Sequence, residues 1–135
     1  MTALTQDHNT PRRDAVDFEF PVAAGVWIHA GGIVALTSTG DVAPGGAANT
    51  LAGIGIAQEA ADNRTGAGGD RRVKVRRGCY RLKNSPGDDA ITSADLWKAC
   101  YIADDATVAK TNPGGASAPA GIVRDVDSLG VWVEF

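Results

Sequence analysis

The sequence has only two cysteines, Cys79 and Cys100, among 135 residues. Two cysteines cannot build the multi-disulfide framework of small secreted domains, so we expect folding in a reducing compartment. The chain contains no run of about 18 apolar residues, and we therefore expect no membrane-spanning helix. The first residues lack the basic-then-apolar order of a secretory signal peptide. Synthesis in a cytoplasm is the simplest interpretation.

Aromatic residues make up 6% of the chain, and neither charge sign dominates, since 13 basic residues face 16 acidic ones. The apolar fraction of 44% is ordinary for a folded protein and argues against a disordered chain. Glycine, in contrast, is abundant, with 17 residues and no collagen-like period. Many glycines without that period indicate many turns, and hence many short strands.

The chain divides into two parts of different character. Residues 1–17 are polar and follow neither the helical nor the strand period, so they form either a frayed tail or an extended arm that orders on a partner. Residues 18–135 read as a single β domain. At least eight short apolar runs separated by glycine-rich turns predict an all-β fold, a small barrel or a sandwich.

Two local features refine this prediction. At most one short helix is expected, within residues 91–99, with Thr92 or Ser93 as its N-cap. The clearest strand covers residues 71–83, but its apolar positions change phase after Val75. A β-bulge at Arg77 and Gly78 would reverse the alternation in this way.

Two parts of the chain have similar residues at a constant offset, as in an internal repeat. The segment from Gly55 to Ala57 matches residues 121–123 at an offset of 66, and Val42 matches Val108 at the same offset. The Val-x-Val pair at Val73 recurs 58 residues later. Chance is one explanation, because Ala, Gly and Val are common here. The other is a duplicated unit, which predicts two similar β-hairpin halves around a common core.

We find no arrangement of residues that indicates catalysis or a cofactor. His29 stands alone in an expected strand, and the two cysteines read as buried small hydrophobes. The acidic pairs, including Asp104 and Asp105, fall in turns, where Asp is favoured for backbone reasons. We therefore expect that the protein is not an enzyme and that it binds no metal and no cofactor. A hydrolase that uses Asp104 and Asp105 is the enzymatic alternative.

The strongest local charge is a basic cluster on the expected strand at residues 71–77. Its members are Arg71, Arg72, Lys74, Arg76 and Arg77. Three interpretations stay open: a face made by Arg72, Lys74 and Arg76 that docks on an acidic protein surface, a solvated face, or a nucleic-acid contact. The net charge of −3 and the sparse aromatics argue against nucleic acid. Trp27, Trp97 and Trp132 are expected in the core, or at an interface.

Five segments together resemble small phage and prophage head proteins of the decoration, or capsid-cement, type. They are MTALTQDHNTPRRD at the start, VAAGVWIHAGGIVALTSTGDVAPG, VKVRRGCYRLKNS, YIADDATVAKT, and AGIVRDVDSLGVWVEF at the end. The resemblance covers most of the chain and consists of turn and strand patterns. It carries over no catalytic residue.

The resemblance implies a structural virion protein on the outer surface of a phage capsid, made in the bacterial host cytoplasm. Its implied partners are the major capsid protein and two further copies of itself in a homotrimer, with no nucleic acid and no membrane. Residues 1–17 would lie along the capsid as an arm. The arm residues expected to contact the capsid are Thr2, Leu4, Thr5, Asn9, Pro11, Arg12 and Arg13.

Overall fold

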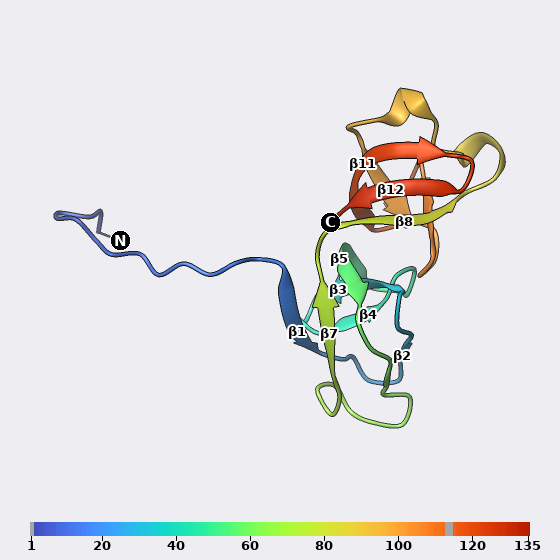
Figure 1. Cartoon of the computed structure of the whole chain (residues 1–135). Coiled ribbons are helices and arrows are strands. Elements are labelled where there is room, and N and C mark those ends of the chain that lie inside the picture. Colours follow the sequence, from blue (N-terminus) through green and yellow to red (C-terminus); the bar gives the residue numbers. More distant parts are fainter. Residues whose placement is uncertain (1, 113–114) are drawn as a thin grey trace.

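The computed structural model describes residues 2–112 and 115–135, and it confirms an all-β fold with an extended N-terminal arm (Figure 1). The first part of the chain contains β1 (Asp17–Pro21), β2 (Trp27–Ile28), β3 (Ile33–Thr37), β4 (Val42–Pro44), β5 (Thr50–Ala57), β6 (Ala61–Asp62) and β7 (Arg72–Arg76). The second part contains β8 (Cys79–Asn84), β9 (Ala99–Ile102), β10 (Thr107–Ala109), β11 (Pro119–Asp127) and β12 (Gly130–Glu134).

These strands form two five-stranded units. The first is a sheet in the order β1-β7-β5-β3-β4, and the second is a closed barrel in the order β10-β8-β12-β11-β9. The barrel closes through the parallel pairing of β10 with β8. In the first unit a single parallel bridge, Val22 to Val42, joins the end of β1 to β4. A short β2-β6 ladder is added to the first unit alone.

The two units are structural repeats, which confirms the duplicated halves predicted from the internal repeat in the sequence. Within the first unit Ile33 pairs with Ile56, and 66 residues later Ala99 pairs with Ile122. The other pairings recur in the same way: Phe18–Val75 with Tyr80–Val133, Leu36–Val42 with Ile102–Val108, and Ala57–Val75 with Val123–Val133. Even the closing contact repeats, since the Val22–Val42 bridge corresponds to the pairing of Asn84 with Val108.

The continuous strand predicted over residues 71–83 is wrong, because β7 ends at Arg76 and β8 begins at Cys79 in a different sheet. The change of phase after Val75 therefore marks the boundary between the repeats, not a bulge. Gly78 lies at this boundary and has φ +155°. The Arg77 N–H donates to Val16 O at 2.8 Å, and the Phe135 N–H makes the equivalent hydrogen bond to Gly78 O at 2.9 Å.

The single common core expected for the two halves is wrong in part, because the structure has two core clusters, one within the first unit and one shared by both units. The first unit's own core includes Val34 and Ala57, whereas Ile33, Ala35 and Ile56 pack with the barrel residues. Since successive residues of a strand point to opposite faces, β3 is buried on both sides, which explains its uninterrupted apolar sequence. The assignment of residues 18–135 to one domain stays a prediction.

The helix expected within residues 91–99 is a single 3-10 turn, Ser93–Asp95. Of the two proposed caps, Thr92 is the N-cap, and it exchanges hydrogen bonds with the turn in a capping box completed by Asp95. A second 3-10 turn covers Gly87–Asp89.

Gly55 and Gly121 occupy equivalent positions because a neighbouring strand passes too close for a side chain. A Cβ on Gly55 would lie 2.6 Å from the carbonyl oxygen of Arg76, and one on Gly121 would collide with that of Glu134. Arg76 and Glu134 are themselves equivalent in the repeat. Gly55 and Gly121 therefore mark equivalent close strand contacts in the two units.

We predict that Gly121→Ala lowers the free energy of unfolding by roughly 1–3 kcal/mol, because the methyl group forces strand β11 away from β12. Urea unfolding followed by circular dichroism measures the change. Gly68→Ala is the matched control, since a Cβ there lies 3.4 Å from the nearest atom, an ordinary contact. Equal losses in the two variants would contradict the close-approach explanation.

Candidate functional site

The N-terminal arm extends away from the body of the protein (Figure 1). Residues 2–17 are all exposed, and Leu4 is 76% exposed. The side-chain contacts within the arm are local ones, His8 with Thr10 and Arg12 with Asp14. The candidate arm residues Thr2, Leu4, Thr5, Asn9, Pro11, Arg12 and Arg13 all lie on this exposed stretch, and Met1 lies outside the described residues.

The root of the arm is attached to β1 and to the segment between β7 and β8. The Arg13 guanidinium lies 5.8 Å from the centroid of the Phe18 ring, and Arg77 Nη1 donates to Ala15 O at 3.5 Å. Beyond this root the backbone polar groups of the arm are free to bind a partner through main-chain hydrogen bonds, as an added strand does.

The basic face of β7 has the alternation that the sequence predicted. Val73 and Val75 are buried, whereas Arg72, Lys74 and Arg76 are exposed on the other side. This face is not purely basic, however, because β1 runs beside it. Arg72 Nε donates to Glu19 Oε1 at 2.7 Å, and Arg76 Nε donates to Asp17 Oδ1 at 2.7 Å.

Sequence reasoning missed these acidic partners. Asp17 and Glu19 alternate with Phe18 and Phe20, so their common face is readable from the sequence, but their position beside β7 depends on a pairing across more than 50 residues. The hydrogen bond to Asp17 raises the pKa of Arg76. The resulting face carries both charge signs in a fixed order, which suits recognition of a protein surface better than contact with a polyanion.

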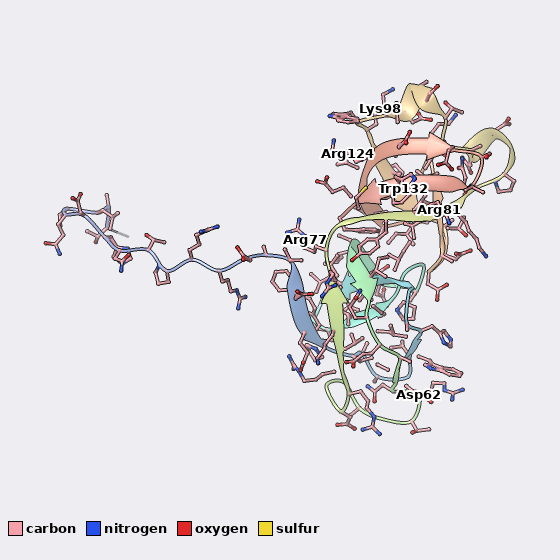
Figure 2. All side chains as sticks on the ribbon, viewed as in Figure 1. Asp62, Arg77, Arg81, Lys98, Arg124 and Trp132 are labelled. Carbon is pink, nitrogen blue, oxygen red and sulfur yellow. The ribbon has the colours of Figure 1, made fainter. Side chains whose placement is uncertain are left out.

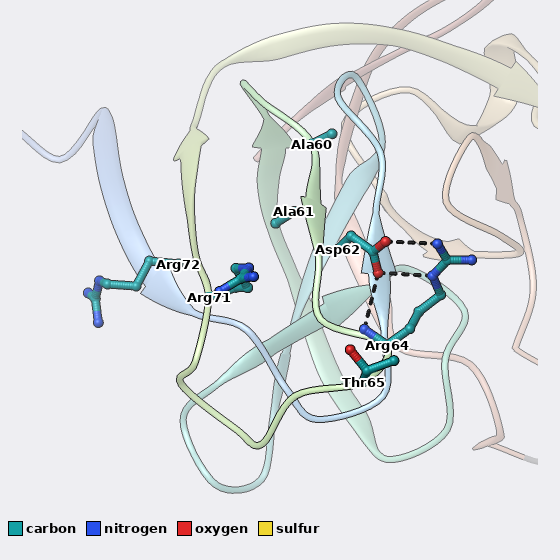
Figure 3. Close-up of a pocket in the computed structure, with 7 residues that line it drawn as sticks. All are labelled: Ala60, Ala61, Asp62, Arg64, Thr65, Arg71 and Arg72. Atoms are coloured by element: carbon teal, nitrogen blue, oxygen red, sulfur yellow. Dashed lines mark hydrogen bonds and ion pairs between the residues drawn. The ribbon is translucent and has the colours of Figure 1, made fainter.

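A surface cavity of about 560 Å³ lies where β6 leads into the loop before β7 (Figure 3). Asp62 accepts two hydrogen bonds from the Arg64 side chain and one from its backbone N–H, and the side-chain bond lowers the pKa of Asp62 to about 2. Arg64 also lies 3.9 Å from the centroid of the Trp27 ring. Arg71 and Arg72 border the other side of this cavity.

A second depression, the junction groove, lies between the two units and has a volume of about 350 Å³. Its lining residues are Phe18, Phe20, Gly53, Ile54, Arg77, Ala120, Gly121, Glu134 and Phe135. Most of these are apolar, and the four large apolar side chains are half-buried. The groove is therefore built by both repeats, close to the root of the arm.

The isolated candidates from the sequence are placed as follows. His29 stacks on Trp27, with ring centroids 4.4 Å apart. Cys100 is buried, and burial raises the pKa of its thiol to about 11. Cys79 is exposed, so its expected burial is wrong: it follows the junction on the outer face of β8, whose buried residue is Leu82.

The acidic pair Asp104 and Asp105 lies in the turn between β9 and β10. Asp104 Oδ1 accepts a hydrogen bond from the Ala106 N–H at 2.8 Å, and the Asp105 carbonyl accepts one from Ile33 in the first unit at 2.8 Å. Both contacts are structural. Within residues 2–112 and 115–135, no group of three or more His, Cys, Asp or Glu side chains is placed to hold a metal ion.

The tryptophans differ in their surroundings. Trp132 is half-buried on β12, Trp27 is 40% exposed, and Trp97 is 69% exposed.

In the part of the chain that the structure describes, no helix has the length and apolar character needed to cross a bilayer.

Compared with protein-family models, curated proteins and solved structures, the chain matches none of them.

We predict that the protein leaves the electrophoretic mobility of duplex DNA and single-stranded RNA unchanged at about 50 mM salt, because Asp17 and Glu19 neutralise part of the β7 face. An Asp17→Asn, Glu19→Gln variant is the control that restores a basic face. A shift by the unmodified protein that disappears at high salt would contradict this prediction and favour the nucleic-acid alternative at residues 71–77.

Proposed function

We propose that this protein is a structural virion protein that binds the outer surface of an assembled phage capsid. It stabilises the shell by bridging neighbouring subunits of the major capsid protein, and it acts as a homotrimer. The observation that carries the proposal is the exposed, extended arm attached to a compact β body (Figure 1). The sequence resemblance to capsid-cement proteins names the class of partner.

The arm is long enough to reach well beyond the body of its own chain. Residues 2–16, fully extended, reach at most roughly 50 Å. An added strand obtains its affinity from main-chain hydrogen bonds, so the arm needs little apolar sequence. Leu4 provides one large apolar side chain near its end.

The charged face of β1 and β7 gives the body a second contact. Arg72 and Arg76 are each tied to an acidic neighbour, so their positions are restricted before any partner arrives. A face with ordered charges of both signs selects the orientation of a protein partner and rejects surfaces with the wrong order. Arg72, Lys74 and Arg76 are the residues that we propose to contact the capsid through this face.

A trimer would make three arms available at once. When one arm is bound, the others are held near their sites, and this effective concentration raises the occupancy of a lattice without any stronger single contact. A bracing protein of this kind needs no catalytic group.

The direct test adds the purified protein to expanded heads that lack it and follows their thermal rupture. We expect the protein to co-sediment with the heads and to raise their rupture temperature. Serum albumin at the same concentration is the control for nonspecific protection. Absence of co-sedimentation together with an unchanged rupture temperature would refute the proposed function.

The role of the arm is tested by deleting residues 2–15, which preserves the backbone bond between Val16 and Arg77. We expect a variant with unchanged circular dichroism and unfolding temperature that binds heads at least tenfold more weakly. An Arg64→Ala variant, altered far from the arm, should bind normally. Unchanged affinity of the deletion variant would remove the arm from the binding mechanism.

A further inference from the structure

Trp97 combines an exposed indole with a backbone conformation that side chains rarely adopt. It has φ +66°, and 69% of its surface is exposed. The equivalent position in the first unit is Gly31, with φ +83°. The repeat preserves the local hydrogen bond as well, because Gly31 donates to Ala57 O at 2.8 Å and Trp97 donates to Val123 O at 2.8 Å.

The fold therefore requires a residue with a positive φ at this position, and in the first unit that residue is glycine. A tryptophan in the same conformation is strained, and its exposed ring contributes little burial to its own chain. Strained positions are retained where the surrounding structure enforces them, and they are frequent at functional sites. Large exposed tryptophans are also common centres of protein interfaces.

Trp97 has a cation over its ring, and an anion lies beside that cation. The Arg124 guanidinium lies 4.7 Å from the ring centroid, and Arg124 Nε lies 3.4 Å from Glu134 Oε1. Leu96, beside Trp97, is 36% exposed. Figure 2 shows Lys98, Arg124 and Arg77 along the side of the molecule from which the arm leaves.

Glu134 connects this corner to the junction groove, since it forms part of the groove wall. The surface thus presents, in order, an aromatic knob, the cation Arg124, the anion Glu134, and a groove walled by Phe18, Ile54 and Phe135 among others. Trp97 does not occupy the groove of its own chain. Arg124 and Glu134 lie between them, and the backbone of Trp97 is tied to β11.

We propose that Trp97 of one copy of this chain occupies the junction groove of a second copy. The groove offers apolar walls to an indole, and its lining includes one anion, Glu134, and one cation, Arg77. Seating the ring there places Lys98 and Arg124 of the first copy near a rim that carries both charge signs, so ion pairs with Glu134 of the second copy can form across the contact. A contact between two different patches of identical chains forms a ring when the rotation between successive copies closes, and the trimer of the proposed function is one such ring.

This inference rests on the self-association named in the proposed function, and its first test is the mass of the protein in solution. We expect the unmodified protein to have a multiple of 13.9 kDa by light scattering and Trp97→Gly to have 13.9 kDa itself. The unfolding temperature of the variant, measured as monomer, should show that the fold is intact, since glycine is the residue that the repeat uses here.

Trp27→Ala is the matched control, because the Trp27 ring is covered by Arg64 and His29 on its own chain, and this variant should keep the oligomeric mass. A monomeric unmodified protein, or an oligomeric Trp97→Gly variant, would overturn the inference. Neither result bears on capsid binding, which the head-rupture experiment tests separately.

The second test identifies the contact itself. In a Cys79→Ser background, which removes the exposed thiol, Trp97→Cys is mixed with Ile54→Cys, each variant supplied on a separate chain. We expect mild oxidation to give disulfide-linked heterodimers of these two variants. Trp97→Cys mixed with Leu129→Cys, an exposed residue outside the groove, is the control and should give none. Equal linkage in both mixtures would overturn the proposed pairing.

Discussion

The arrangement of every long strand depends on one hydrogen-bonding register that the chain uses twice. In each unit the first strand pairs with the last strand. The last strand also pairs with the strand that carries Gly55 or Gly121, and the outer strand closes the unit by pairing with the first. One close approach in that register, Gly55 to Arg76 and Gly121 to Glu134, leaves no room for a side chain in either unit. Because both units obey the same constraint, differences between them are informative.

Those differences lie where the protein has surface features available for binding. The first unit begins with an exposed arm, whereas the second is joined to the end of β7 by Arg77 and Gly78. The first unit also carries the added β2-β6 ladder, with Asp62 and Arg64. The second replaces a glycine by Trp97. A duplicated scaffold supplies the stability, and the departures from its symmetry supply the contacts that we propose.

Local patterns in the sequence were sufficient for most of the strands and for a cap at Thr92 or Ser93, because each depends on residues a few positions apart. The repeat could be predicted because matching residues recur at a constant offset of 66. Local patterns were insufficient wherever a long-range pairing decides the outcome. The phase change after Val75 was read as a bulge, since the sequence does not say that the next residues join another sheet. The ion pairs of Arg72 and Arg76 required β1 to lie beside β7. The exposure of Trp97 and Cys79 depended on the same tertiary arrangement.

The central claim is that this β body is held on the outside of a capsid by its arm. A density map of expanded heads incubated with the protein tests that claim most directly. The account predicts added density on the outer surface, with the β body above the shell and an extended segment of arm length running from it across the boundary between two capsid subunits. Heads with no added density, or with density only on the inner surface, would contradict it.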